Sequence, residues 1–266
     1  MRTQPLISIV LPTFEPEPVK LAAAIESIRN QSFSAFECMI VDDTPDTKVE
    51  SLLVDHGVLD DQRFRYVHNS SRLGIAASLN VGIGLATSEW IARADGDDIL
   101  HPEKLAIQWR ALQSDSRIDV LGSDYVSVTA RGKKRQIRQP TGHKAIIMKM
   151  RAGFCAIAHP TAVFRKAALL EVGGYNEHLP CVEDLDLLLR LDNAGKRFSS
   201  VNSLLLEYAQ GQKHRSDLNW RINLSTRIRN YSSKSMLSST LGIVLVWMHT
   251  ISPTFIKASA YRFLRG

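Results

Sequence analysis

The chain has 266 residues, of which 44% are hydrophobic and 23% charged, so it has the composition of a folded protein and not of a disordered one. Its formal net charge is +6, and its length suits one large α/β domain, alone or with a short appendage. Cys38, Cys155 and Cys181 lie far apart without CxxC spacing, which argues against a disulfide framework and a cysteine zinc site.

Strand and helix patterns alternate over the first hundred residues. Strands are expected at residues 6–12, 36–43, 63–69 and 89–98, and helices around residues 21–28 and 72–86. This alternation predicts βαβ units and a parallel sheet. Because the first apolar run is broken at Pro12, it is too short for a signal peptide, and we expect a cytoplasmic protein.

The pattern is less regular after Pro102. A helix is expected at residues 103–113, a strand at 118–130, a basic hairpin or loop at 130–140, and a strand, short helix and Gly-Gly turn across 158–175. The acidic start of residues 182–195 favours a helix that stops at Gly195. We expect a main domain over residues 1–210 and an appendage over residues 211–266.

Two of the predicted strands end in carboxylates. Asp42 and Asp43 follow the second strand, and the sequence Asp-Gly-Asp-Asp at residues 95–98 follows the fourth. In open α/β sheets ligands bind at the carboxyl ends of the strands, where a divalent cation relieves the repulsion between such charges. A solvated turn that caps the next helix explains residues 95–98 equally well from the residues alone.

The sequence contains no GxGxxG or GxxxxGK[ST] motif for phosphates, and no GxSxG or HExxH motif. The remaining candidates for a general base are Glu183 and Asp184, at the start of a predicted helix where a carboxylate stays ionised. Helix capping is the simpler interpretation of these two residues taken alone.

Six short sequences, in this order and spacing, resemble the family-2 glycosyltransferases of GT-A fold: SIVLPTF, IVDD, ARADGDDILHPEKL, HPTAVFRK, GGY and EDLDLLLR. The resemblance runs from about Ser8 to Tyr208. It implies an α/β fold with a Rossmann-like, mostly parallel central sheet flanked by helices, with the catalytic domain over residues 1–210. It also implies an inverting sugar transferase whose donor is a nucleoside-diphosphate sugar, with a UDP-sugar expected.

The resemblance places the donor site in the loops after three of the strands. Residues 12–14 would line the base pocket, and Asp42, Asp43 and Arg72 would contact the base and ribose. Phe14 stands where Tyr is common, and Glu15 stands where Asn is common, so the role of Glu15 is left open. The donor-binding residues implied in this way are Pro12, Thr13, Phe14, Glu15, Asp42, Asp43, Arg72, Asp95 and Gly96.

The resemblance also implies a divalent cofactor, Mn²⁺ or Mg²⁺. Asp97 is the expected metal ligand, and Asp95 is expected to contact the metal or the ribose. His214 is either a further metal ligand, as in some relatives, or a solvated histidine of the basic tail.

The base and the acceptor are expected on the other side of the donor. Asp184 matches the general base of the family, and Glu183 would shape its surroundings. His159 is an acceptor-side contact or a packed histidine. Processive members carry a QxxRW sequence after the base helix, which residues 211–224 lack. We therefore expect one sugar to be added per encounter, to a glycan or lipid-linked glycan acceptor.

The C-terminal segment differs from the rest of the chain in charge. Residues 211–266 carry nine basic side chains and one acidic, a net charge of +8 that leaves −2 for residues 1–210. The apolar stretch at residues 241–251 is too short to span a bilayer, but its surroundings suit an interfacial helix. We expect attachment to the anionic inner face of the cell membrane, with ordinary packing on the domain as the alternative. No nucleic-acid motif accompanies the charge, so no nucleic-acid partner is expected.

Two other functions fit an α/β sheet with acidic loops. Nucleotidyl transfer to a sugar phosphate normally uses a Gly-rich, basic N-terminal loop, and residues 12–18 contain neither glycine nor lysine. A nucleotide-sugar-binding protein without transferase activity would not need both Asp97 and Asp184.

Overall fold

The computed structural model describes residues 4–46, 48–210 and 216–252. Its strands are β1 (Ile7–Thr13), β2 (Phe36–Asp42), β3 (Phe64–His68), β4 (Trp90–Arg93), β5 (Ile99–Leu100), β6 (Val120–Val128), β7 (Lys134–Ile137), β8 (Val163–Arg165) and β9 (Phe198–Ala209). Its α-helices are α1 (Pro18–Arg29), α2 (Lys48–Asp55), α3 (Ile75–Leu85), α4 (Lys104–Ser114), α5 (His143–Arg151), α6 (Lys166–Glu171), α7 (Glu183–Asn193), α8 (Asp217–Arg229) and α9 (Met236–Ile251). Two short 3₁₀ helices are η1 (His159–Thr161) and η2 (Ser233–Ser235).

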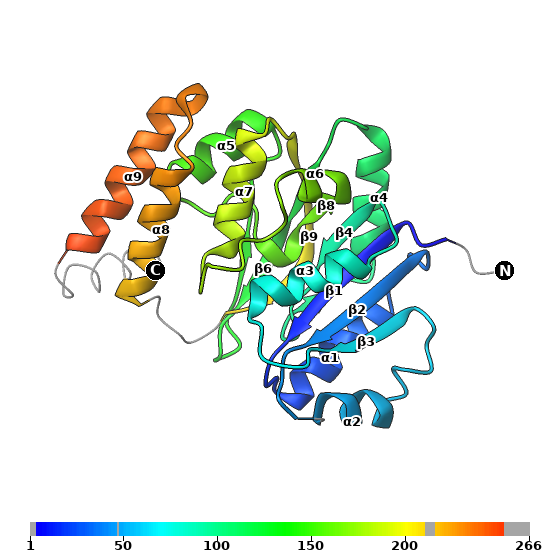
Figure 1. Ribbon diagram of the computed structural model, residues 1–266. Coiled ribbons are helices and arrows are strands. Elements are labelled where there is room, and N and C mark those ends of the chain that lie inside the picture. The colour runs from blue at the N-terminus through cyan, green and yellow to red at the C-terminus, as the bar shows by residue number, and fades with distance from the viewer. Residues whose placement is uncertain (1–3, 47, 211–215, 253–266) are drawn as a thin grey trace.

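The strands form one sheet in the order β3-β2-β1-β4-β8-β6-β9-β5, with β7 paired to β6 (Figure 1). The four strands from β3 to β4 are parallel, as the sequence predicts. Beyond β4 the sheet is mixed, because β8 runs antiparallel to both β4 and β6, while β6 and β9 are parallel. The expectation of a mostly parallel sheet is therefore correct for the N-terminal half only, since four of the eight ladders between the described strands are antiparallel.

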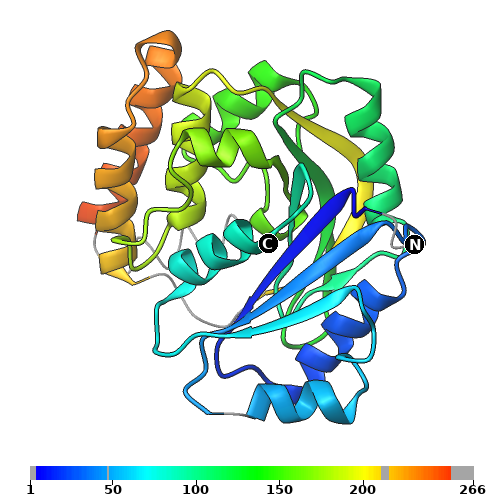
Figure 2. The same ribbon diagram turned by 45° about the vertical axis from the view of Figure 1, so that its right-hand side comes forward.

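Helices cover both faces of the sheet (Figure 2). One face packs against α3, α5, α6 and α7, and the other against α1, α2 and α4. The side chains of a central strand alternate between the two faces, so that Val10 of β1 faces α3 while Ile9 and Leu11 face α1. Helix α3 lies very close to β1, because a Cβ atom at Gly82 would come within 2.4 Å of Val10 Cγ1.

The helix predicted around the acidic sequence after Val182 is confirmed as α7, and it ends as expected. Gly195 has a φ of 74°, and the amide of Lys196 donates to the carbonyl of Leu191 at 3.0 Å. The basic hairpin is confirmed as the β6–β7 pair. Strand β9 was not predicted, because its sequence FSSVNSLLLEYA lacks regular alternation of apolar and polar residues.

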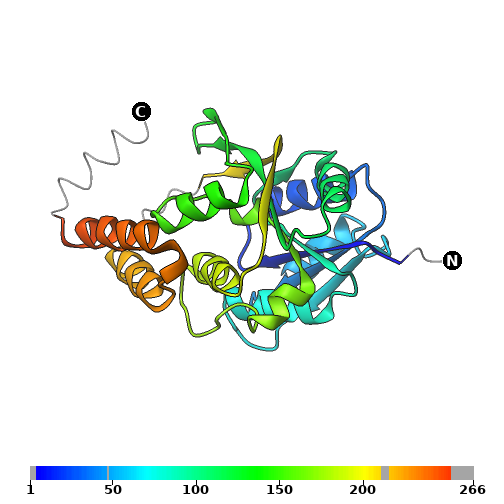
Figure 3. The same cartoon turned by 90° about the horizontal axis from the view of Figure 1, so that it is seen from above.

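Helices α8 and α9 stand together at the end of the molecule away from β3, with α8 next to α7 and α9 outermost (Figures 1 and 3). The predicted boundary at residue 210 borders residues 211–215, which lie outside the described part, so the division into two units remains a prediction. None of the helices that the structure describes combines the length and apolar character needed to cross a bilayer.

Candidate active site

The loops after β1 and β4 lie at the point where successive strands change from one side of β1 to the other. The chain leaves β1 through α1 to pair β2 on one side, and it later returns through α3 to pair β4 on the other. Such a switch point leaves a crevice at the carboxyl ends of the strands. The predicted donor residues at the ends of β1, β2 and β4 therefore share one edge of the sheet.

Asp42 and Asp43 are buried at the end of β2, and both carboxylates are already bonded. Asp42 accepts hydrogen bonds from the amide of Thr44 at 3.0 Å and from the hydroxyl of Tyr66 at 2.9 Å. Asp43 accepts from the Leu73 amide at 2.7 Å and the Gly74 amide at 2.8 Å. These bonds fix the loop that leads into α3.

The loop after β1 carries the residues predicted to hold the base. Thr13 lies beside Asp42 in the parallel ladder, and its buried hydroxyl has no hydrogen-bond partner among the described residues. The guanidinium carbon of Arg72 lies 4.2 Å from the ring centroid of Phe14, within cation–π range. Thr13, Phe14 and Arg72 thus come together at this edge, and Phe14 remains partly exposed.

Glu15 has a left-handed backbone, with a φ of 44°, and its amide donates to Thr44 Oγ1 at 2.9 Å. This bond ties the loop after β1 to the loop after β2. A non-glycine residue held in this region stores strain that the surrounding contacts must offset, a feature concentrated at functional sites.

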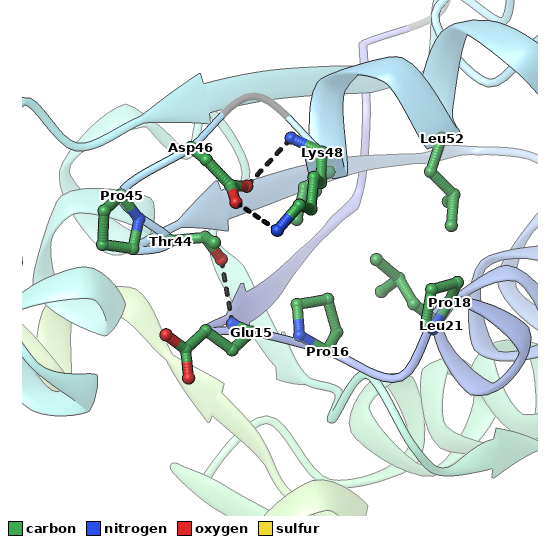
Figure 4. Close-up of a pocket in the computed structure, with 10 residues that line it drawn as sticks. Glu15, Pro16, Pro18, Leu21, Thr44, Pro45, Asp46, Lys48 and Leu52 are labelled. Atoms are coloured by element: carbon green, nitrogen blue, oxygen red, sulfur yellow. Dashed lines mark hydrogen bonds and ion pairs between the residues drawn. The ribbon is translucent and has the colours of Figure 1, made fainter.

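A pocket of about 510 Å³ opens beside these loops, between the N-terminal ends of α1 and α2 (Figure 4). Leu21 of α1 and Leu52 of α2 form apolar walls, and the Asp46–Lys48 ion pair stands on the α2 side. Leu21 also reaches the acidic loop, because a Cβ atom at Gly96 would lie only 3.2 Å from Leu21 Cδ1. A cavity of this size with a few polar groups is typical of small-molecule sites.

The acidic loop after β4 is organised by Arg93. Arg93 is buried in β4 and donates from Nη2 to Asp95 Oδ1 and from Nη1 to the carbonyl of Ala94. Asp97 is accessible to solvent, but nearby protein atoms partly desolvate its carboxylate. This desolvation, and then the charge of Asp95, raises the pKa of Asp97.

Asp98 is fully buried and joins the acidic loop to β9. Its Oδ1 accepts from the Ala209 amide at 2.7 Å, whereas its Oδ2 has no partner among the described residues. Burial, and then the charge of Asp95, raises the pKa of Asp98 to about 8. The carboxylates of residues 95–98 are therefore crowded and incompletely compensated by the protein.

The predicted base residues begin α7. Val182, which precedes them, has a left-handed φ of 58° and provides no side-chain cap. Asp184 Oδ1 accepts from the amide of Leu185 at 2.7 Å. Burial, and then the charge of Asp184, raises the pKa of Glu183 to about 7. A carboxyl group with this pKa exchanges a proton near neutral pH.

The acidic loop and the start of α7 lie within electrostatic reach of each other. Arg93 lowers the pKa of Glu183 and Asp95 raises it, and the charges of these three residues and Asp184 all act on Tyr175. Residues about 90 positions apart in the sequence thus interact electrostatically with the same arginine.

His159 packs at the side of this group. Its Nε2 atom lies 2.6 Å from the hydroxyl of Tyr175, and its ring meets those of Tyr175 and Phe164 edge to face. Burial, and then the charge of Arg93, lowers the pKa of His159 well below its usual value. A neutral, packed imidazole results.

Sequence reasoning missed Arg93 and Tyr175. An arginine within the apolar strand WIAR could have been noticed, because a buried cation needs a partner, and Asp95 stands two residues later. Tyr175 belongs to the GGY sequence, but that sequence does not indicate its hydrogen bond to His159 or its proximity to the charges of α7, which depend on tertiary folding.

The metal site expected from the sequence remains a prediction. Among the described residues, no three or more His, Cys, Asp or Glu side chains form a group that could hold a metal ion. Asp95 and Asp97 nevertheless fit Mg²⁺ or Mn²⁺, because such ions are commonly bound by one or two carboxylates with substrate phosphates. His214 lies outside the described residues.

Comparison with known proteins gives consistent results. The model of the family described as Glycosyl transferase family 2 matches residues 8–173. An uncharacterized glycosyltransferase of Methanocaldococcus jannaschii is 29% identical over 206 residues, 77% of this chain and 71% of that protein. The amylovoran biosynthesis glycosyltransferase AmsE of Erwinia amylovora is 27% identical over 210 residues, 77% of each chain.

Among solved structures, residues 1–349 of S. aureus TarS in complex with UDP-GlcNAc have the same fold. The TM-score is 0.72 at 16% identity, over 93% of this chain and 73% of that chain. A longer TarS structure is matched over only 41% of its length. The GT-A fold expected from the sequence is confirmed. The family match ends before α7, so it does not include Glu183 and Asp184.

Proposed function

The chain belongs to glycosyl transferase family 2 and is a glycosyltransferase, and we propose that it moves one sugar from a nucleoside-diphosphate sugar to a hydroxyl group of a glycan, with inversion at the anomeric carbon. The observation that carries this proposal is the electrostatic interaction of Arg93 with two groups of carboxylates. One group, in the loop of residues 95–98, suits a diphosphate-bound cation, and the other, at the start of α7, suits a base.

The donor is proposed to lie across the carboxyl ends of β1, β2 and β4. The exposed ring of Phe14, with Arg72 stacked on it, offers a surface for a nucleobase, and the unpartnered hydroxyl of Thr13 offers a hydrogen bond. Asp42 and Asp43 would contact the base and ribose through oxygen lone pairs that their internal bonds leave free. A uridine nucleotide is proposed because the similar TarS structure contains UDP-GlcNAc.

Asp95 and Asp97 are proposed to hold Mg²⁺ or Mn²⁺ with the donor diphosphate. Asp97 is exposed and carries a raised pKa, which a bound cation would lower by stabilising the carboxylate. When bound, the cation would stabilise charge on the departing diphosphate. Arg93 would keep Asp95 oriented through their ion pair.

Asp184 is proposed as the general base, and Glu183 as the residue that tunes it. The acceptor oxygen forms a bond to the anomeric carbon while its proton passes to the carboxylate. The bond from that carbon to the diphosphate oxygen breaks, and the nucleoside diphosphate leaves with the electron pair. Attack from the face opposite the leaving group inverts the carbon without a covalent enzyme intermediate.

The acceptor is proposed to be a hydroxyl group of a growing surface or exported glycan. The relative AmsE is named for amylovoran biosynthesis, which supports this class. The lack of QxxRW in residues 211–224 supports addition of a single sugar per encounter. His159 and Tyr175 lie beside the base helix, so either could limit the space available to the acceptor.

A screen of nucleotide sugars tests the proposal. Purified protein is incubated with each sugar nucleotide and Mn²⁺, Mg²⁺ or EDTA, and release of nucleoside diphosphate is measured. We expect release from one nucleotide sugar, with metal, that disappears in an Asp97→Ala variant. Release that is unaffected by EDTA and by this variant would contradict the proposed site.

A further inference from the structure

Helix α9 is fixed to the domain by one narrow face. Ser239, Gly242 and Val246 are buried, and they recur at the spacing of one helical face. A Cβ atom at Gly242 would lie 1.9 Å from the carbonyl oxygen of Arg151, so only glycine permits this approach to the end of α5.

Two buried arginines hold this contact. Arg151 donates to the carbonyl of Asn230 at 3.0 Å and to Ser239 Oγ at 3.3 Å. Arg227 of α8 donates to the carbonyls of Met150 and Arg151, at 3.0 and 3.1 Å. The orientation of α9 about its own axis is therefore determined by the domain, and so is the face that it turns outward.

The outward face of α9 is apolar. Leu237 is 84% exposed, Ile251 61% and Trp247 50%, and the one exposed polar residue of the helix is Thr240. Contiguous apolar surface of this kind is rare on soluble proteins unless something covers it. The exposed apolar residues, here named the α9 outer face, are Met236, Leu237, Leu241, Val244, Leu245, Trp247, Met248 and Ile251.

Positive charge accompanies the α9 outer face. Arg221 and Arg229 are exposed on α8, and Lys234 is exposed between the two helices. Asp217, at the start of α8, is the one Asp or Glu among residues 216–252. Leu218 and Ile228 are exposed beside the two arginines on α8. Helices α8 and α9 are neighbours at one end of the molecule, so this end combines apolar and basic side chains. That combination is complementary to anionic lipid, which offers acyl chains and negative headgroups together.

We propose that the outer faces of α8 and α9 bind an anionic lipid bilayer, with α9 lying in the plane of the membrane surface. A parallel orientation follows because none of the described helices can cross a bilayer. The exposed arginines of α8 and Lys234 contact headgroups, while the α9 outer face enters the boundary between headgroups and acyl chains. This attachment does not depend on the proposed transfer reaction.

Vesicle co-sedimentation of the full-length protein tests the charge contribution. Vesicles of phosphatidylcholine alone are compared with vesicles that also contain phosphatidylglycerol, at low and high salt. Each basic residue near an anionic surface strengthens binding about fivefold, so a combined R221Q, R229Q and K234Q variant should bind about 100-fold more weakly. A matched variant with R110Q, R131Q and K133Q, which are also exposed, should bind like the wild type.

Substitution of apolar residues tests the contact itself. A combined L237Q, L241Q and I251Q variant should lose at least about tenfold in binding, and a V19Q, V54Q and L170Q variant, exposed elsewhere, should not. Point substitutions are preferable to removal of α9, since Gly242 and Ser239 belong to the packed interior.

Trp247 provides a direct signal. Its fluorescence should shift to shorter wavelength with anionic vesicles, and a W247F variant should bind without that shift.

Absence of binding to anionic vesicles, or equal losses in the control variants, would overturn the proposal. So would a lipid-free dimer that the L237Q, L241Q and I251Q variant converts to a monomer, because a second copy would then cover this face. Release of nucleoside diphosphate is measured in the same preparations. A variant that loses vesicle binding but keeps this release tests the membrane proposal alone, and the reverse result tests the proposed function alone.

Discussion

The ends of β2 and β4 look alike in the sequence, because each buried strand is followed by adjacent acids, yet their electrostatics differ. At the end of β2, Asp43 accepts three hydrogen bonds, from Asn69 and from the amides of Leu73 and Gly74. At the end of β4, Asp98 has one carboxylate oxygen with no partner among the described residues, and its pKa is raised.

This difference separates carboxylates that already stabilise a loop, and could meet a donor only through their remaining lone pairs, from carboxylates that need a ligand. A carboxylate that the protein satisfies by itself stabilises a loop, whereas crowded carboxylates that it leaves uncompensated need a ligand or a proton. The start of α7 belongs with β4 in this respect, since the pKa of Glu183 is raised as well. The following predictions test whether the two kinds of carboxylate behave differently.

Replacement of Asp97 by alanine should have the largest effect on activity. Transfer should fall by about 10³-fold or more, because several kcal/mol of leaving-group stabilisation depend on the cation that Asp97 is proposed to hold. Calorimetric titration should show weaker donor binding with Mn²⁺ but equal binding in EDTA. Asp55→Ala, at an exposed aspartate at the end of α2 that does not line the pocket, is the control. Equal donor affinity of Asp97→Ala and the wild type in Mn²⁺ would assign the metal to other residues.

Asp184→Asn should lower kcat by about 10²–10⁴-fold and leave the donor Kd nearly unchanged, as expected of a general base. Turnover and donor titration on the same preparation measure the two quantities. Comparison with Glu183→Gln distinguishes the neighbours. If Asp184→Asn keeps its turnover while Glu183→Gln loses it, Glu183 is the base.

Asp43→Asn should act on stability. The amide group cannot accept at both positions, so the bond from the Gly74 amide is lost and those at the other oxygen weaken. With about 1.5–3 kcal/mol for a hydrogen bond to a charged group, we expect Tm to fall by about 5–10 °C. Asp97→Ala should leave Tm nearly unchanged in a metal-free thermal melt. A variant at Asp43 that melts like the wild type would show that the β2 carboxylates are not structural.

The smallest expected effect is a pH dependence at Glu183. Its pKa rises from 4.5 to about 7 on folding, so its contribution to stability is present below the unfolded pKa and is lost as pH rises through about 7. Glutamine does not ionise, so the Glu183→Gln variant does not lose stability in this way as the pH rises. The Tm of the variant should therefore increase relative to the wild type between pH 5 and pH 8, and parallel Tm curves would contradict the raised pKa.

The sequence alone determined the local parts of the fold and the chemistry that they carry. Apolar runs and helical spacing located β1–β4, α3 and α7, because strand and helix periodicity depend on neighbouring residues. The position of the acids at the ends of β2 and β4 was also predicted, because the sequence shows where each apolar strand ends and which residues follow it. The order of the six motifs identified the family.

Only the tertiary structure decided which of these acidic groups lie near one another and which have all their hydrogen-bond partners within the protein. Strand β8 runs antiparallel between β4 and β6, and no periodicity in β8 reveals the direction of its partners. Arg93 lies within electrostatic reach of Glu183 although they are far apart in the chain, and the bonds of Asp43 come from residues 69–74. The apolar residues of α9 look equivalent in the sequence. Contact of Gly242 with Arg151 determines which of them are buried and which face outward, because burial depends on a partner that the helix itself does not encode.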